Sequence, residues 1–176
     1  MPVPEAPLQD DGHGRSAAGP GWFVVNLAET AGRRSERTGT YSDAEGSERF
    51  AEFGFGVHIL WPGQPNGLYH EESNQEEFVV LSGECVLIVE EQERRLGPWD
   101  HFHCPAGTRH IMVGAGDGPC AILMAGSRKP GQTIFYPESE VAARHGASAA
   151  EATSAPREAY ADFPRAEPAP FPWPPS

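Results

Sequence analysis

The chain has 176 residues, 39% of them hydrophobic, which suits one domain with a sizeable core, and its formal net charge is −12. A field of that sign repels nucleic acid and anionic membranes, so we expect neither as a partner. No apolar run approaches the roughly 18 residues that cross a bilayer, and the N-terminus lacks the basic and apolar segments of a signal peptide.

The first third of the chain carries few signals of regular structure. Residues 1–20 are rich in proline, glycine and aspartate, a composition that predicts disorder. The run "WFVVN" (22–26) is predicted to form a short strand. Residues 28–49 are polar and rich in breakers, so a long loop is predicted there.

From residue 53 onward, short runs rich in β-formers follow one another, with turn signals between them and no helical period. This pattern predicts an all-β sandwich or barrel. The clearest hairpin is "FVVLSGECVLIV" (78–89), in which Gly83 is free to take a positive φ in the turn. The predicted strand regions are 53–61, 67–72, 76–81, 84–90, 93–96, 100–105, 109–114 and 120–126.

The C-terminal part has a different texture. Pro137 precedes the helix-prone run "ESEVAARH", which Gly146 closes, and a second short helix is predicted within residues 150–163. The tail is so dense in proline that it should form neither a helix nor a ladder strand. The predicted segments are a disordered 1–20, a β-barrel with an N-terminal arm over 21–136, a short helical extension over 137–163 and a Pro-rich tail over 164–176.

The residues that could carry chemistry lie on two neighbouring strand regions. His70 and Glu72 are two apart and share one strand face, and Glu76 follows across a predicted bend. His110 opens a later strand, after the turn "PAGTRH" (105–110). Two imidazoles with one or two carboxylates suit a divalent ion such as Zn, Fe, Mn or Ni, and two histidines with one carboxylate would match a facial triad.

This spacing resembles the two motifs of the cupin family, and the resemblance covers residues 53 to 126. The first motif reads G, five residues, H-x-H, three or four residues, E, six residues, G. The second reads G, five residues, P-x-G, two residues, H, three residues, N. The matching positions are His70, Glu76, Gly83, Pro105, Gly107 and His110.

The chain departs from the family pattern at four positions. Glu72 stands in place of the second histidine, and Gln64, with Gly63 before it, in place of the first motif's opening glycine. Trp99 and Gly114 replace the opening glycine and the asparagine of the second motif. Glutamate is also a metal ligand, so the change at Glu72 keeps a possible site but makes it a weaker Lewis acid if both glutamates bind.

The resemblance implies an all-β jelly roll with irregular arms and one or two short C-terminal helices. It also implies a small soluble protein, in which one divalent ion is held by His70, Glu72, Glu76 and His110 and a small organic molecule binds in the barrel. Glu72 would be the fourth ligand or a general base. Family members often dimerise, so a homodimer is expected, with residues 22–26 exchanged or docked.

The family spans oxygenases, isomerases, decarboxylases and metal-free binders, so fold alone does not select a reaction. If the chain is an enzyme, we expect a metal-dependent oxygenase or isomerase. The alternative is a non-catalytic, metal-free cupin that binds a small ligand. The odd count of three cysteines indicates reduced thiols and a cytoplasmic location.

Other polar residues have simpler interpretations. Glu71 and Glu77 should face away from the site by strand alternation, and Glu72 itself could be a solvated strand-end charge. His101 and His103 share one strand face and Phe102 the other, and the sequence does not say which face looks inward. These histidines, like His58, are expected to be structural, and Cys104 to be a buried inert thiol, as Cys85 and Cys120 are.

Overall fold

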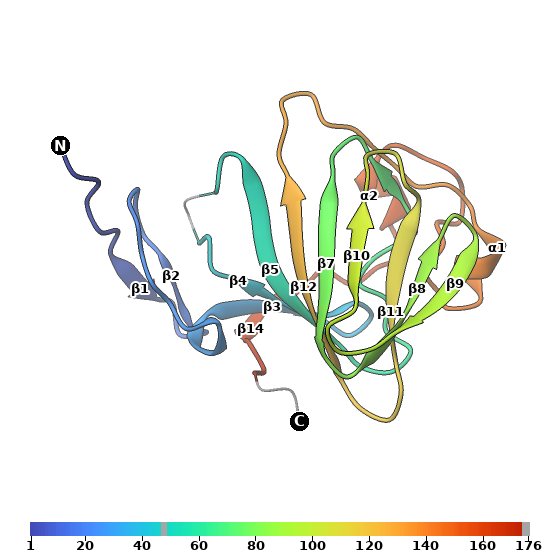
Figure 1. Ribbon diagram of the computed structural model, residues 1–176, viewed down its shortest axis with the longest axis horizontal. Coiled ribbons are helices and arrows are strands. Elements are labelled where there is room, and N and C mark those ends of the chain that lie inside the picture. Colours follow the sequence, from blue (N-terminus) through green and yellow to red (C-terminus); the bar gives the residue numbers. More distant parts are fainter. Residues whose placement is uncertain (47–48, 174–176) are drawn as a thin grey trace.

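A computed structural model describes residues 1–46 and 49–173, and it confirms the predicted all-β class (Figure 1). A seven-stranded sheet runs in the order β10-β7-β12-β5-β4-β3-β14 and a three-stranded sheet in the order β11-β8-β9, with antiparallel neighbours throughout. The strands are β3 Ala31–Ser35, β4 Gly39–Asp43, β5 Phe53–Leu60, β7 Glu76–Ser82, β8 Glu84–Val89, β9 Gln92–Leu96, β10 His101–Cys104, β11 His110–Ala115, β12 Cys120–Ser127 and β14 Glu167–Pro170.

Smaller elements flank the two sheets. They are β1 Leu8–Asp10, β2 Arg15–Ala17, the 3-10 helix η1 Leu27–Glu29, β6 Glu71–Glu72, β13 Ile134–Phe135, α1 Glu140–Ala143 and α2 Pro156–Ala159. The β1–β2 pair extends away from the sandwich as an N-terminal arm, whereas the two helices lie beside the smaller sheet (Figure 1).

The core forms where the two sheets face each other, because alternate residues of each strand point inward. On β7 these are Phe78 and Val80, and on β8 they are Cys85 and Leu87, all of them buried. Residues of β10, β11 and β12 complete the same cluster. Phe78 of this cluster also contacts the ring of His110, so the apolar core borders the polar site described below.

The predicted hairpin over residues 78–89 is wrong, because β7 and β8 belong to different sheets. β7 pairs with β10 and β12, and β8 pairs with β9 and β11. The chain crosses from one sheet to the other at Gly83, which has φ +70° as predicted. The apolar runs showed that both strands are buried, but they carry no information about which later strands they pair with.

The predictions for the N-terminal third are also wrong. The expected strand 22–26 has only an isolated bridge at Trp22, and Val24 is exposed. The expected loop 28–49 contains β3 and β4, whose buried positions include the hydroxyl residues Ser35, Thr40 and Ser42. Ser42 Oγ accepts a hydrogen bond from the Val57 amide at 2.9 Å. Polar side chains paired in this way hide the two-residue apolar period. Within residues 1–20, β1 and β2 replace the predicted disorder.

The C-terminal helices are present, one turn each. The side chain of Ser139 caps α1 by accepting from the Ala142 amide at 3.0 Å, and Gly146 ends the segment at φ +66°. The prediction that the tail forms no ladder strand is wrong for residues 167–170, which pair with β3; residues 174–176 lie outside the described part.

Proline is tolerated in β14 because this strand is the edge of the sheet. Pro168 and Pro170 are two residues apart, so their nitrogens both face away from β3, while the intervening Ala169 can still pair. Phe171 then packs against Val57 and Ile59 on the outer face of the large sheet. The proline spacing therefore allows an edge strand, although the density of proline predicted none.

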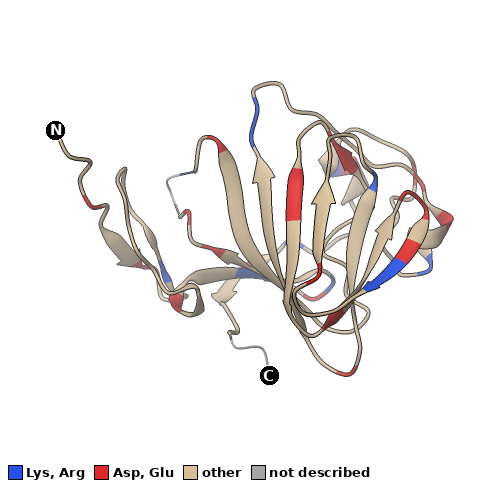
Figure 2. Ribbon diagram, in the orientation of Figure 1, with Lys and Arg blue, Asp and Glu red and all other residues tan. Residues whose placement is uncertain are grey.

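Acidic residues are spread over the arm, the sheets and the loops rather than gathered in one tail (Figure 2). The negative charge is thus a property of the folded body. In the described part of the chain, no helix has both the length and the apolar character needed to cross a membrane.

Candidate metal centre

The site is built around a backbone bridge between His70 and His110. The His110 amide donates to the His70 carbonyl at 2.9 Å, and the His70 amide donates back to the His110 carbonyl at 3.2 Å. This exchange holds the two imidazole rings side by side, with centroids 4.8 Å apart. Glu76, the first residue of β7, reaches the same point, and one ligand atom from each of the three residues lies within 4.8 Å of the others.

Backbone carbonyls fix the tautomer of both imidazoles. His70 Nδ1 lies 2.7 Å from the Leu68 carbonyl oxygen, and His110 Nδ1 lies 3.1 Å from that of Thr108. A carbonyl oxygen can only accept, so each Nδ1 carries the hydrogen and each Nε2 presents a lone pair. Histidine ligands in metal sites are commonly oriented by such a second hydrogen bond.

Glu76 places a carboxylate among these lone pairs. Its Oε2 atom is buried without a hydrogen-bond partner among the described residues, and His110 Nε2, at 3.5 Å, is too far for a good hydrogen bond. Burial, with a smaller contribution from the nearby Glu72 charge, raises the pKa of Glu76 to about 8. The ligand-free site therefore holds a protonated carboxyl at neutral pH.

The two histidines are neutral in this environment. Burial, followed by the neighbouring His70, lowers the pKa of His110 to about 4. Burial also lowers the pKa of His70, against the opposing effects of the Leu68 carbonyl and Glu72. Neutral imidazoles are the form that binds a metal, so neither histidine has to lose a proton first.

Glu72 lies on the same side as His70 but outside the close group. Its Oε1 atom is 4.0 Å from His70 Nε2, and its side chain is 24% exposed. The expectation that the two residues share a face agrees with this distance. Its role as a fourth ligand or general base stays a prediction.

The remaining charged residues of this region point away, as strand alternation predicts. Glu71 pairs with Arg109 at 2.8 Å near the surface. Glu77 accepts hydrogen bonds from His101 at 2.8 Å and His103 at 2.7 Å on the outer face of the large sheet. The two histidines of β10 are therefore outside the site, which resolves the question of which face of that strand looks inward.

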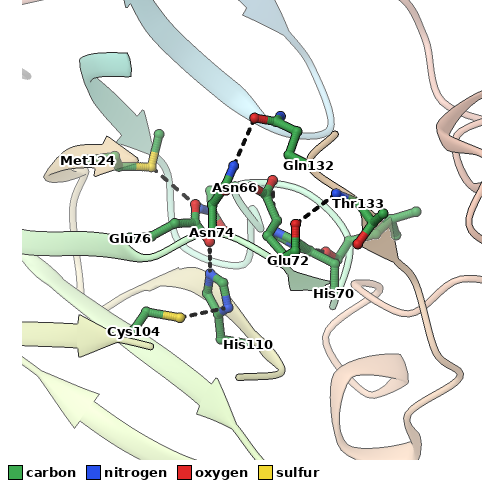
Figure 3. Close-up of polar contacts among 12 residues, drawn as sticks. Asn66, His70, Glu72, Asn74, Glu76, Cys104, His110, Met124, Gln132 and Thr133 are labelled. Atoms are coloured by element: carbon green, nitrogen blue, oxygen red, sulfur yellow. Dashed lines mark hydrogen bonds and ion pairs between the residues drawn. The ribbon is translucent and has the colours of Figure 1, made fainter. Parts of the chain in front are cut away.

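The inward face of β10 supplies packing behind His110. Cys104 Sγ lies 3.4 Å from His110 Nδ1, so the ring is held between Cys104 and Glu76 (Figure 3). Phe78 and Phe102 pack on the same ring, with centroids 5.2 and 5.7 Å away. Burial raises the pKa of Cys104 to about 12, so the residue is a thiol at neutral pH, as expected of a buried cysteine.

The three close residues open onto a cavity of about 630 Å³. This size is typical of pockets for small organic molecules. The wall away from the site is formed by β4, β5 and the end of β12, and it includes His58, which was expected to be only structural. Burial lowers the pKa of His58 to about 4, and its Nε2 contacts the Thr38 carbonyl.

Several cavity residues were not identified from the sequence. Asn66 donates weakly to Met124 Sδ at 3.6 Å and accepts from the Met112 amide at 3.0 Å, and the side chains of Asn66 and Met124 line the cavity. A usable signal was the run "FGFG" (53–56), in which Gly54 and Gly56 line the cavity, Phe55 borders it and both phenylalanines are exposed. Glycine at two positions of the same strand face indicates that the space beside that face is kept free.

A cation fits the observed donor set. Two imidazole lone pairs and a buried Glu76 oxygen without a partner in the described chain converge from separate strands, and a positive ion that replaces the Glu76 proton would give all three a partner. Two nitrogens and one oxygen leave other coordination positions free toward the cavity. Among the described residues, this is the group of three that meets the geometry for an ion.

Comparison with known proteins places the site inside a recognised domain. A cupin-domain family model matches residues 56–126, which include His70, Glu76 and His110. Among solved structures, a sugar phosphate isomerase of a cupin superfamily from Silicibacter pomeroyi is 29% identical with a TM-score of 0.51, and the match covers 57% of this chain and 66% of that one. The chain thus spans just under two thirds of that isomerase.

Two further structures share the fold. A predicted oxalate decarboxylase from Thermotoga maritima is 22% identical with a TM-score of 0.53, over 61% of this chain and 100% of that one. A polyketide cyclase from Streptomyces resistomycificus is 17% identical with a TM-score of 0.54, over 63% and 83%. No curated protein matches the chain. At these identities the two structures support the architecture alone.

Proposed function

We propose, from the cupin-domain family model that matches residues 56–126, that this protein binds one divalent metal ion and acts on a small organic molecule in the adjoining cavity. His70, Glu76 and His110 would hold the ion. The observation that carries the proposal is the buried Oε2 of Glu76, which faces two imidazole lone pairs without a hydrogen-bond partner in the described chain.

The two histidines already have the tautomer that metal binding needs. The Leu68 and Thr108 carbonyls keep both Nε2 atoms free, so binding requires no change of tautomer. Glu76 has to release its proton, which links metal binding to pH. A bound ion would polarise an oxygen of the organic molecule or lower the pKa of a bound water.

Glu72 would serve the reaction from beside the ion. With an oxygen 4.0 Å from His70 Nε2 and a partly exposed side chain, it can reach either an ion or a proton on a bound molecule. Between an oxygenase and an isomerase, the name of the Silicibacter pomeroyi relative supports an isomerase. The residues of the cavity wall determine which organic molecule binds beside the ion.

The test is the metal content of full-length protein purified without chelators and without a metal-affinity tag. The proposal predicts about one divalent ion per chain in the wild type and loss of that ion in His110→Ala with the fold intact by circular dichroism. His103→Ala is the matched control, because His103 lies on the outer face and should leave the metal content unchanged. A wild type that binds no divalent ion even when one is supplied would favour the metal-free binder.

A further inference from the structure

An arginine at the mouth of the cavity has an unusual environment. Arg128, the residue after β12, lies over Gly54 of β5 and lines the cavity, and its side chain is 22% exposed. A Cβ atom on Gly54 would lie 2.8 Å from Nη2, 3.2 Å from Cζ and 3.3 Å from Nε. These distances place the Nη2, Cζ and Nε side of the guanidinium close to the backbone of the strand at Gly54.

Glycine at position 54 is required by the space that the Arg128 guanidinium occupies and not by the backbone conformation of the strand. Its φ lies outside the left-handed region, so a larger residue would fit the strand conformation. Glycine inside a strand weakens it and often marks close approach of another group. Here the group that approaches is Arg128, because any side chain on Gly54 would displace the guanidinium from the sheet.

The hydrogen-bonding edge of Arg128 is mostly used within the protein. Nη1 donates to Glu45 Oε2 at 2.8 Å and to the Phe50 carbonyl at 2.6 Å, and Nη2 donates to Glu45 Oε1 at 2.8 Å. Three of the five N–H donors of the guanidinium are therefore engaged, and the Glu45 carboxylate balances its charge. The two N–H groups left, on Nε and Nη2, belong to the edge nearest Gly54, so a phosphate or carboxylate that used both would have to approach against the strand.

The face of the guanidinium is what remains available. The guanidinium lies against Gly54 on one side and Arg128 lines the cavity, and a guanidinium face that borders a cavity can stack on a flat π-system. The neighbouring wall also keeps bulk away. Gly56 and Gly126 line it, and a Cβ atom would have its nearest contacts at 3.4 and 3.5 Å, so packing does not require glycine at either position.

From this geometry we infer that Arg128, backed by Gly54 and fixed by Glu45, is a stacking platform for a planar, conjugated ring of the ligand. The space left by Gly56 and Gly126 admits the body of that ring beside the platform. The inference rests on the proposed function in taking this cavity as the ligand site. It makes the ligand an aromatic or conjugated ring compound rather than one recognised by a terminal phosphate.

The test uses two probes with the same carbon skeleton and hydroxyl, 2-naphthol and its saturated form decahydro-2-naphthol, titrated calorimetrically into full-length protein. The wild type should bind the planar probe about fivefold to tenfold more tightly, the range expected for a partly desolvated cation–π contact. Arg128→Lys keeps the charge and removes the plane, so it should abolish this preference while leaving binding of the saturated probe unchanged. Gly54→Val should act in the same way by displacing the guanidinium.

Arg49→Lys is the matched control, because Arg49 lines the same cavity and should not alter the preference. Equal affinity for the two probes in the wild type, absence of 2-naphthol binding, or an equal loss of both probes in Arg128→Lys would overturn the inference. Displacement of 2-naphthol by inorganic phosphate would overturn it as well. All titrations are repeated on chelator-treated and Zn²⁺-supplied protein, so a failure to bind metal is seen separately from a failure of stacking.

Discussion

Replacing Glu76 by glutamine should remove a pH dependence from the stability of the metal-free protein. The folded state raises the pKa of this carboxyl from 4.5 to about 8. Between those values the native protein holds a proton that the unfolded chain has lost, so stability falls as pH rises. The contribution is fully present below pH 4.5 and is lost as the pH rises through about 8.

The size of the effect follows from the linkage relation. A full proton difference changes the free energy of unfolding by about 1.36 kcal/mol per pH unit. Because native Glu76 is half ionised at about pH 8, its contribution to the stability of chelator-treated wild type should fall by about 2.3 kcal/mol between pH 6 and pH 8. Glutamine has the shape of the protonated carboxyl and does not titrate. Glu76→Gln should therefore lack this loss.

The assay is urea unfolding of both proteins, dialysed against chelator, at pH 6, 7 and 8. Subtracting the free energy of unfolding of Glu76→Gln from that of wild type at each pH removes the contributions of other titrating groups, such as the cysteines. Glu71→Gln is the control, because Glu71 pairs with Arg109 near the surface and should keep the wild-type slope. Parallel stability curves for wild type and Glu76→Gln over this range would refute the account of a buried, partnerless carboxyl.

Three other predictions concern metal affinity and the tail. Because Glu76 must release a proton, Zn²⁺ affinity measured by competition with a chromogenic chelator should rise about tenfold from pH 6.5 to pH 7.5, and a flat profile would argue against Glu76 as a ligand. Glu72→His should keep the metal and shift preference toward more nitrogen-loving ions in competition assays; if Glu72→Ala and Glu72→His both leave affinity and preference unchanged, Glu72 is a surface charge. Phe171→Ala should lower the free energy of unfolding by about 3–5 kcal/mol, since Phe171 is buried; a change under about 1 kcal/mol would show that the tail is a passive extension.

The sequence predicted the strands that carry their own apolar alternation. Residues 76–82 and 84–89 are examples, because each alternates buried and partly exposed positions within one run. It failed at β3 and β4, where buried serines and threonines stand in place of apolar residues. It failed at β14 as well, because the compatibility of Pro168 and Pro170 with an edge depends on the partner strand.

The candidate site could be predicted from the sequence better than the residues around it. His70, Glu76 and His110 follow from the motif spacing, and the structure brings them together through one backbone bridge. The platform at Arg128 could not be predicted in the same way. It depends on Gly54, far earlier in the chain, and on Glu45 in a loop, and no local pattern connects the three.

X-ray absorption spectroscopy of the metal-loaded, full-length protein tests the central claim most directly. The account predicts a first shell of nitrogen and oxygen atoms at roughly 2.0–2.2 Å, with the outer scattering of two imidazoles. Cys104 should contribute no sulfur, because it stays a thiol behind His110. A sulfur shell at about 2.3 Å would contradict the site formed by His70, Glu76 and His110. So would a wild-type spectrum that lacks imidazole scattering and does not change in His110→Ala.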